Sequence, residues 1–495
     1  MITRIKIDGF KSLLNTDLYL GPFTCIAGAN AIGKSNFFDA IMFLSSLADN
    51  TILQAVKSVR SENQRHSNIK DIFFKSGSDY YDTMCFEIDM LVSREAEDDL
   101  GQLAQAKITS LKYTLKLKLN EESSNRELIE IIEEELKPIT LGETKKQLYF
   151  NYKSDWINSV LYGRRAGTPF ISTDKEKNLV KLHSDSKENK RGGRTTEFVA
   201  EKMPRTLLST VTAESPTAFL ARQEMRNWMM LQFEPSALRQ PNSIFEVKNA
   251  EITAAGLNLP ATLYRLHNEK NEKDIYQSLT NKLKGLVNEV KEISVDKDER
   301  RDLLTLEIQF KDGLKLPAQS LSDGTLRFLG LAIIQEDSSS NGLICLEEPE
   351  NGINPKKIEE MVKLLEEMVT DTDYSVDEDN PLRQVIVNSH SPKVVSIVAD
   401  ESLYLAFERE IYVEKFKKKV KYTGFSALQA TWKTKNKLAP QTSKGDIISY
   451  LEKNEGYTKS NDLESNSEEN HQKNASNKPK KTVVENVSQM KIAFQ

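Results

Sequence analysis

The chain has 495 residues and a formal net charge of -5, and 28% of its residues are charged. This length is enough for more than one average domain and for a core that needs no covalent cross-links, and the mild negative charge gives no general electrostatic case for nucleic acid binding. The three cysteines lie in apolar runs without metal-ligand spacing, and the sequence has neither a signal peptide nor a membrane-spanning run, so we expect a cytoplasmic protein with no membrane contact.

The N-terminal part of the chain predicts strands around one loop and one helix. Residues 2–7 alternate isoleucine with polar residues, residues 23–27 are apolar, and an amphipathic pattern covers 34–47. These patterns predict a strand, a second strand, a loop and a helix. Alternation over 84–91 and 108–119 predicts further strands, which would form an antiparallel sheet.

The middle of the chain has weaker periodicity. Residues 128–136 are ambiguous, because their glutamates favour helix and their isoleucines favour sheet, and we assign them to a strand. Periodicity fades over 155–240, apart from a helical pattern at 216–231. Two further helices, one beginning near Pro260 and one over 274–290, do not sustain heptads, so we expect no long coiled coil.

The second half of the core resumes at 303–310 and is expected to end around Phe407. After about residue 443 the composition turns to Asn, Ser, Glu and Lys, which predicts a largely disordered tail with a short docking segment over 483–494. The chain is therefore divided into five segments: 1–152, with the loop and an antiparallel β lobe; 153–250, an inserted lobe; 251–410, the second half of the core; 411–442, an extension; and 443–495, the tail.

The strongest motif lies between the second strand and the first helix, and it reads Gly28-Ala29-Asn30-Ala31-Ile32-Gly33-Lys34-Ser35. It matches G-x-x-x-x-G-K-[ST], and we call residues 28–35 the phosphate loop. Its glycines let the backbone approach phosphate, its N–H groups bind the anion, Lys34 reaches the β- and γ-phosphates, and Ser35 can ligate Mg²⁺. A chance glycine turn is the alternative, and the strand, loop and helix around the motif disfavour it.

An apolar strand over 343–346 ends in two carboxylates, Glu347 and Glu348. Sites in α/β proteins collect at the carboxyl ends of strands, and strand alternation is expected to point the two side chains to opposite sides. One carboxylate can support Mg²⁺ while the other activates the attacking water in phosphoryl transfer. We assign Glu347 to the metal and Glu348 to the water. Alone, such a strand end is more often a solvated surface, so the catalytic assignment of Glu347 and Glu348 depends on the other motifs.

Two more motifs lie on either side of this strand in the sequence. Leu321-Ser322-Asp323-Gly324-Thr325 precedes an apolar helix, whose N-cap would be Ser322 or Asp323, and Asn388-Ser389-His390-Ser391-Pro392 follows an apolar strand. A helix cap and a strand-end polar residue are the plain structural interpretations. Taken together, the four motifs resemble the ABC-type ATPases of the RecF, SMC and OLD-like group. Three further elements fit that group: Gly9-Phe10-Lys11-Ser12, residues 256–261 and the Glu-Glu-Pro-Glu run at 347–350.

The resemblance implies an α/β fold: an ABC-type P-loop ATPase head with a mixed central sheet, an antiparallel β lobe and a mainly helical insertion. It also implies that residues 321–325 are the signature motif of this group. The protein would then be a homodimer or higher homo-oligomer, in which the phosphate loop of one subunit and the signature motif of the other enclose ATP and Mg²⁺. The implied site residues are Glu348, His390 and Lys34 as catalytic residues; Gly28, Asn30, Gly33, Lys34, Ser35, Asn36, Lys11, Ser322 and Gly324 as nucleotide-binding residues; and Ser35 and Glu347 as metal ligands. His390 would sense the γ-phosphate.

The chain departs from the group's pattern at a few positions. Asp323 stands where transporters usually have glycine, and Glu347 stands where aspartate is commoner. No Q-loop glutamine is identified, because nothing in the polar stretch around Gln64 marks that residue. The residues after Phe407 lack the sheet and the acidic pattern of a TOPRIM nuclease domain, so we expect an ATPase without its own nuclease.

Three functions follow from this interpretation. We favour an ATPase whose head dimerisation regulates a separate effector protein, a nuclease, as in the Septu and PARIS-type antiphage systems whose ATPase subunits the chain resembles. The alternative is a RecF-like DNA repair ATPase, with nucleic acid as the partner and the basic cluster of Lys187, Lys190, Arg191 and Arg194 as its contact. A nucleotide-binding scaffold with little turnover is disfavoured by the presence of both Lys34 and Glu348.

Overall fold

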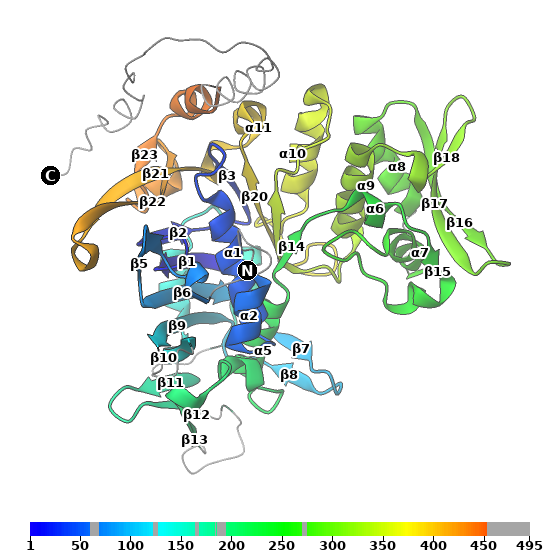
Figure 1. Ribbon diagram of the computed structural model, residues 1–495. Coiled ribbons are helices and arrows are strands. Elements are labelled where there is room, and N and C mark those ends of the chain that lie inside the picture. Colours follow the sequence, from blue (N-terminus) through cyan, green and yellow to red (C-terminus); the bar gives the residue numbers. More distant parts are fainter. Residues whose placement is uncertain are drawn as a thin grey trace, which may run out of the picture. The chain divides into compact units, whose positions relative to one another are not determined.

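A seven-stranded sheet combines strands from both ends of the chain (Figure 1). This computed structural model describes residues 1–59, 69–121, 127–163, 168–183, 185, 195–269 and 275–452. The sheet order is β14-β19-β20-β3-β21-β22-β23, and every neighbouring pair is parallel except β21 and β22. The strands are β3 (Phe23–Ala27), β14 (Met229–Leu231), β19 (Gly342–Glu347), β20 (Arg383–Ser389), β21 (Leu403–Val413), β22 (Lys418–Leu428) and β23 (Gln441–Thr442).

The seven-stranded sheet lies between two hydrophobic cores. In β3, Ile26 faces the first core, whereas Cys25 and Ala27 face the second. In β19, Cys345 and Ile344 divide in the same way. Strands covered on both faces must be apolar at nearly every position, which is why these segments are mainly apolar in the sequence and do not alternate with polar residues.

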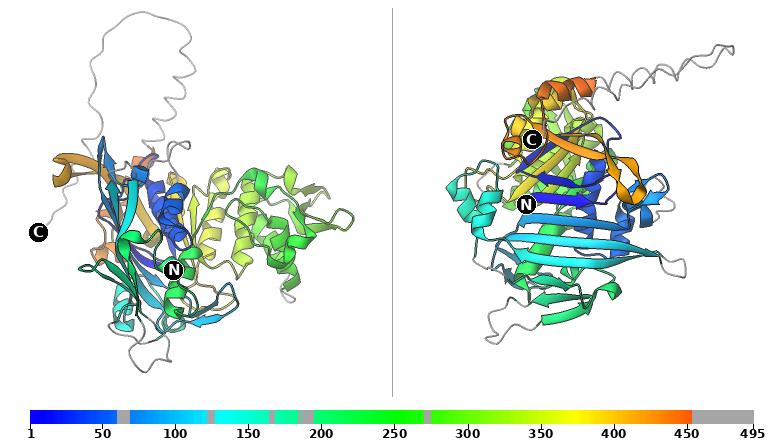
Figure 2. Two further views of the ribbon diagram at one scale, coloured as in Figure 1. Left: turned by 60° about the horizontal axis from the view of Figure 1, so that its bottom comes forward. Right: turned by 90° about the vertical axis from the view of Figure 1, so that its left-hand side faces the viewer.

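An eight-stranded antiparallel sheet closes the first core from the other side. Its order is β13-β12-β11-β10-β9-β6-β1-β2, and its strands run side by side in the right-hand view of Figure 2. Helices α1, α2 and α5 contribute buried side chains to the core that both sheets share. The strands are β1 (Ile2–Asp8), β2 (Thr16–Tyr19), β6 (Thr83–Leu91), β9 (Ser110–Glu121), β10 (Glu127–Pro138), β11 (Ile171–Asp174), β12 (Leu179–His183) and β13 (Thr195–Val199).

Helices α7 to α11 and a small sheet pack around the second core. The small sheet contains β15 (Asn242–Ser243), β16 (Val290–Asp298), β17 (Leu303–Phe310) and β18 (Lys315–Pro317). Two short hairpins are β4 (Lys75–Ser76) with β5 (Asp79–Tyr80), and β7 (Glu95–Glu97) with β8 (Leu103–Gln105). The helices are α1 (Lys34–Leu47), α2 (Ile52–Ser58), α3 (Leu141–Gln147), α4 (Ser154–Val160), α5 (Pro216–Arg226), α6 (Pro235–Leu238), α7 (Leu259–Glu269), α8 (Ile275–Leu286), α9 (Asp323–Glu336), α10 (Ile358–Glu367), α11 (Pro392–Ile397) and α12 (Trp432–Lys435).

Several predicted elements are confirmed. The helix expected over 34–47 is α1, and the ambiguous segment 128–136 is a strand within β10. The helix expected over 216–231 is wrong beyond Arg226, because residues 229–231 form β14 on the edge of the parallel sheet beside β19. A place beside a buried strand overrides the local helical pattern there.

Two other boundaries differ from the prediction. The helix expected over 274–290 ends at Leu286, and Val290 begins β16, where it pairs with Phe310. The core also continues beyond Phe407, because β21 pairs with both β3 and β22. The boundary predicted near residue 410 therefore falls inside a strand.

The segment expected as an inserted lobe, 153–250, is divided between several parts of the fold. Strands β11 to β13 extend the eight-stranded sheet, α5 packs in the first core, and β14 joins the seven-stranded sheet. Some sequence features lie outside the described residues: Gln64, the basic cluster Lys187, Lys190, Arg191 and Arg194, and the segment 483–494.

A buried carboxyl group gives the eight-stranded sheet a pH-dependent stability. Glu134 on β10 accepts hydrogen bonds from the N–H groups of Leu207 (2.7 Å) and Leu208 (2.8 Å) and from the Tyr113 hydroxyl (3.2 Å). Burial raises the pKa of Glu134 to about 7 from 4.5. Because the folded state holds this proton more tightly, the stabilisation is complete below pH 4.5 and is lost as the pH rises through 7.

We therefore expect the free energy of unfolding to fall by about 3 kcal/mol between pH 4.5 and 8 through this one group. Urea unfolding of the parent and of Glu134→Gln across that range measures the effect. The glutamine does not titrate, so the difference between the two unfolding free energies should change with pH. Parallel pH curves for the two proteins would contradict the assignment.

Candidate functional site

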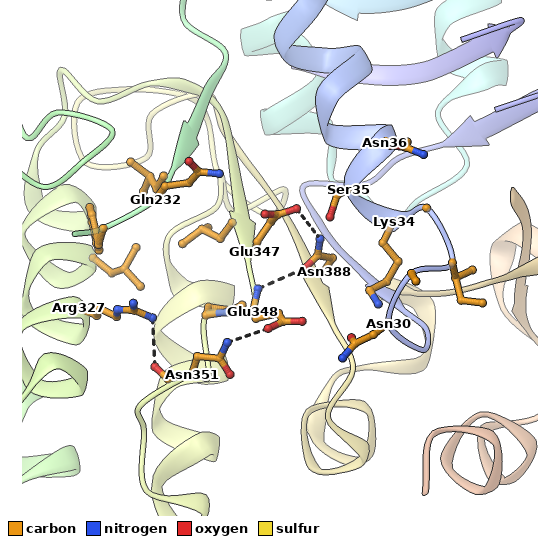
Figure 3. A pocket seen from close by; sticks show the side chains of 18 residues that line it. Asn30, Lys34, Ser35, Asn36, Gln232, Arg327, Glu347, Glu348, Asn351 and Asn388 are labelled. Atoms are coloured by element: carbon orange, nitrogen blue, oxygen red, sulfur yellow. Dashed lines mark hydrogen bonds between the residues drawn. The ribbon is translucent and has the colours of Figure 1, made fainter. Parts of the chain in front are cut away.

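A pocket of about 730 Å³ opens where the parallel strands β14, β19, β20 and β3 end. Carboxyl ends of parallel strands meet at one edge of a sheet, so residues far apart in the sequence converge there. Figure 3 shows side chains from the phosphate loop, the end of β19 and helix α9 around this space. The lining residues are Asn30, Ala31, Ile32, Gly33, Lys34, Ser35, Asn36, Leu231, Gln232, Phe233, Arg327, Leu331, Leu346, Glu347, Glu348, Pro349, Asn351 and Asn388.

The phosphate loop connects β3 to α1 and leaves the start of that helix open. Gly33 is the N-cap of α1 with φ 96°, and among the described residues no side chain caps the helix. The first N–H groups of the helix are therefore available to an anion. The Lys34 ammonium donates to the carbonyl oxygens of Gly28 (2.6 Å) and Ala29 (2.7 Å). Burial lowers the pKa of Lys34.

The two carboxylates at the end of β19 lie in the same pocket, contrary to the alternation that the sequence predicted. Glu348 leaves the strand geometry with φ 46°, a left-handed conformation that costs a non-glycine residue about 1 kcal/mol. Its N–H donates to the backbone oxygen (3.0 Å) and the side-chain oxygen (3.2 Å) of Asn388 on β20. Asn388 also donates to Glu347 at 3.4 Å. Asn388 therefore holds the turn that directs both carboxylates to one side.

The Glu348 carboxylate is fixed by two partners. One oxygen lies 2.7 Å from Nδ1 of His390, and the other accepts the Asn351 amide at 2.7 Å. His390 does not itself line the pocket and reaches it only through Glu348. The neighbouring Ser389 hydroxyl donates to Glu350, a buried carboxyl whose pKa is raised by burial. These contacts order residues 388–391 behind the Glu348 carboxylate.

Sequence reasoning missed Gln232, which lines the pocket directly after β14. Leu231 pairs with Leu346 in parallel register, so Gln232 lies beside Glu347 at the sheet edge. The signal in the sequence is the apolar run over 228–231 followed by a polar residue, and its helical pattern led to the wrong prediction of a helix there. Asn351, Asn388 and Arg327 were missed as well; in the sequence they are polar residues in a loop, at a strand end and on an apolar helix.

The motif at 321–325 lies away from the phosphate loop of its own chain. Ser322 is the N-cap of α9 and accepts the Thr325 N–H at 3.3 Å. Asp323 is paired with Arg239 at 2.5 Å. A side chain at position 324 would lie 2.3 Å from the carbonyl oxygen of Gly352, so the backbone contact requires Gly324. Neither Ser322 nor Gly324 lines the pocket.

Three other predicted residues have different surroundings. Lys11 pairs with Asp39 on α1 at 2.7 Å and does not line the pocket. Asn36 lines it and donates to Ser12 at 2.8 Å. Gly28 is the first residue of the loop and does not line the pocket, and an added Cβ there would be 2.7 Å from the carbonyl oxygen of Ala406.

The donors in the pocket suit Mg²⁺ held together with phosphate. In the part of the chain that the structure describes, no cluster of three or more histidine, cysteine or acidic side chains could hold a metal by itself. Mg²⁺ usually takes one or two carboxylates, and substrate phosphates and water supply its remaining ligands. Ser35, Glu347 and Gln232 are oxygen donors on the wall of this pocket. The residues therefore fit a metal that arrives with a nucleotide.

Comparisons of the fold found several heads of SMC proteins. An SmcHead bound to the C-winged helix domain of ScpA has 12% identity and a TM-score of 0.43, covering 86% of this chain and 98% of that chain. The SMC head domain from Thermotoga maritima has 12% identity and a TM-score of 0.35, covering 85% and 97%. An Smc head with an extended coiled coil, bound to the C-terminal domain of ScpA derived from Pyrococcus furiosus, has 11% identity and a TM-score of 0.39, covering 88% and 98%. No curated protein matches the chain.

A phosphate loop between a buried parallel strand and a helix, beside a strand that ends in carboxylates, defines the P-loop class of nucleotide-binding proteins. The model of the AAA ATPase domain matches residues 1–395. The chain belongs to this family and is an ATPase. Among the described residues, every helix is too short or too polar to cross a membrane.

Proposed function

We propose that this pocket is the site of ATP binding and hydrolysis. The observation that carries the proposal is the meeting of the phosphate loop, Glu347 and Glu348 around one pocket. Lys34 exchanges its carbonyl partners for the β- and γ-phosphate oxygens, and the open N–H groups of α1 bind the same anion. Ser35 and Glu347, with Gln232 beside them, would hold Mg²⁺, which would neutralise charge on the phosphates when bound.

Glu348 is the general base in this proposal. Its carboxylate accepts a proton from water as the water oxygen attacks the γ-phosphorus, and the bond from that phosphorus to the β–γ bridging oxygen breaks. ADP leaves with the bridging oxygen, and the proton passes from Glu348 to solvent. His390 and Asn351 hold the two carboxylate oxygens, which orients the base before reaction.

We further propose that each complete site needs two chains. Support comes from Ser322 and Gly324, which stand at the start of α9 and do not line the pocket of their own chain. The N-terminus of a helix favours an anion. In a head-to-tail pair, this helix start would contact the γ-phosphate held by the phosphate loop of the partner, and Asn30 would lie near the contact between the chains.

A complementation experiment tests the two-chain site. Lys34→Ala breaks the phosphate loop and Ser322→Arg fills the space before α9, so each variant alone should be inactive. A mixed dimer has one site with both defects and one with neither. Equimolar mixing should then restore about a quarter of the parent activity, because half of randomly formed dimers are mixed and each has one intact site.

The outcomes of the mixing experiment are distinct. No recovery, with both variants folded by circular dichroism, would show that the motif acts within its own chain. Recovery should fade on dilution below the dimer dissociation constant. A specific ATPase activity that is constant on dilution of the parent would contradict a shared site.

We propose that ATP-driven pairing regulates a separate effector protein, a nuclease, in prokaryotic antiphage defence. This proposal rests on the resemblance of the phosphate loop, residues 321–325, residues 343–348 and residues 388–392 to the ATPase subunits of such systems. Copurification of the tagged chain with the product of its neighbouring reading frame tests this role. Binding to duplex DNA that weakens steeply with salt, without any protein partner, would favour the RecF-like repair function instead.

A further inference from the structure

The hairpin formed by β21 and β22 lies beyond residue 395, where the family match ends, yet it contacts the phosphate loop directly. Thr423 on β22 is 1% exposed. Its hydroxyl donates to the carbonyl oxygen of Ile32 at 2.8 Å, and its N–H donates to the carbonyl oxygen of Ser12 at 2.9 Å. The two hydroxyl oxygens of Thr423 and Ser12 lie 2.6 Å apart.

These contacts form a chain in which each hydroxyl proton has a defined place. The Asn36 amide donates to the Ser12 hydroxyl oxygen at 2.8 Å. Because the Thr423 hydroxyl proton goes to Ile32, the proton shared with Ser12 must come from Ser12. This series of hydrogen bonds therefore runs from α1, through the turn after β1, to β22 and back to the phosphate loop.

The glycines of the phosphate loop are explained by the same hairpin. A Cβ at Gly33 would lie 2.3 Å from the Thr423 hydroxyl oxygen and 2.4 Å from that of Ser12. A Cβ at Gly28 would lie 2.7 Å from the carbonyl oxygen of Ala406 on β21. Real side chains do not approach this closely, so the backbone of the loop packs directly against the hairpin as well as against its own strand.

We infer that Thr423 is a positioning residue for nucleotide binding, which rests on the proposed role of the phosphate loop. In a trans peptide the C=O and the following N–H point in opposite directions. Holding the Ile32 carbonyl towards Thr423 directs the Gly33 N–H away from the hairpin, to the side where the loop encloses the pocket. The hydroxyl of Thr423 thereby prearranges an N–H donor for phosphate without touching the nucleotide.

Substitutions at Thr423 separate this role from simple packing. Thr423→Val keeps the shape and removes the hydroxyl, so the Kd and KM for ATP should rise about tenfold while kcat at saturating ATP changes less than about twofold. Thr423→Ser keeps the hydroxyl and should restore the parent values. Thr431→Val is the matched control, because its buried hydroxyl also donates to a backbone carbonyl, that of Leu428 at 2.8 Å, and makes no contact with the phosphate loop in this series of hydrogen bonds; it should leave the Kd unchanged.

Nucleotide titration calorimetry and steady-state phosphate release give these constants, and the Tm without nucleotide reports stability. An unchanged Kd in Thr423→Val, or a Thr423→Ser variant as weak as the valine variant, would overturn the inference. If Thr423→Val does not fold, Ser12→Ala breaks the same series of hydrogen bonds and should also raise the Kd for ATP. An unchanged Kd in Ser12→Ala would overturn the inference as well. Lys34→Ala separates a failure of this inference from a failure of the proposed ATP site. If Lys34→Ala binds ATP normally, the proposed function itself fails.

Discussion

Glu348→Gln is expected to lower kcat for ATP hydrolysis by about 10²–10⁴-fold and to leave ATP binding intact. The amide has nearly the size of the carboxylate and can still bond to His390 and Asn351, but it cannot accept a proton from water. The left-handed turn at Glu348 is fixed by backbone contacts to Asn388, which the substitution does not alter. ATP should therefore bind without turnover, and paired chains should accumulate.

Phosphate release at saturating ATP measures the rate, and size-exclusion chromatography with Mg²⁺ and ATP measures the pairing. Glu359→Gln is a suitable control, because Glu359 is an exposed residue in the first turn of α10 and the charge change is the same. It should hydrolyse ATP at the parent rate. A Glu348→Gln variant within threefold of the parent would exclude this residue as the base.

The second large effect is expected at Lys34. Lys34 is 6% exposed as a residue, and its ammonium is bonded to two loop carbonyls, so the side chain is already inside the site where the phosphates would lie. Each hydrogen bond from a charged group to phosphate is worth about 1.5–3 kcal/mol. We expect Lys34→Ala to raise the Kd for ATP by about 100-fold or more, measured by calorimetry.

Lys356→Ala serves as the control for the loss of a positive charge, because Lys356 is exposed, lies in the short helical turn Pro355–Lys357 and does not line the pocket. Its Kd should equal that of the parent. A Kd for Lys34→Ala within threefold of the parent would mean that residues 28–35 do not bind the phosphates, despite the motif.

The local part of this site was predictable from the sequence. The phosphate loop, its helix and the strand before Glu347 depend on neighbours within about one turn or one strand, and their patterns are regular. Both carboxylates were found for the same reason. Their orientation was predicted wrongly, because a strand's alternation stops where Asn388, on another strand, turns the backbone of Glu348.

The non-local part was not predictable. Gln232 belongs to the site only because β14 pairs with β19, and nothing near residue 232 specifies that partner. Thr423 is similar, since its importance depends on a contact with Ile32 almost four hundred positions earlier. Patterns of hydrophobicity indicate which face of an element is buried, but they do not identify the element that packs against that face.

The central position of β3 has a consequence for how the protein is made. This strand is synthesised within the first 27 residues, yet both strands that flank it, β20 and β21, begin more than 350 residues later. At ribosomal rates of about 5–20 residues per second, the nascent chain carries an unpaired, mainly apolar strand for roughly 20–70 s. During that time ATP has no assembled loop to bind and cannot help folding. We therefore expect the growing chain to depend on chaperones, and chains that end before residue 383 to lack any nucleotide-stabilised fold.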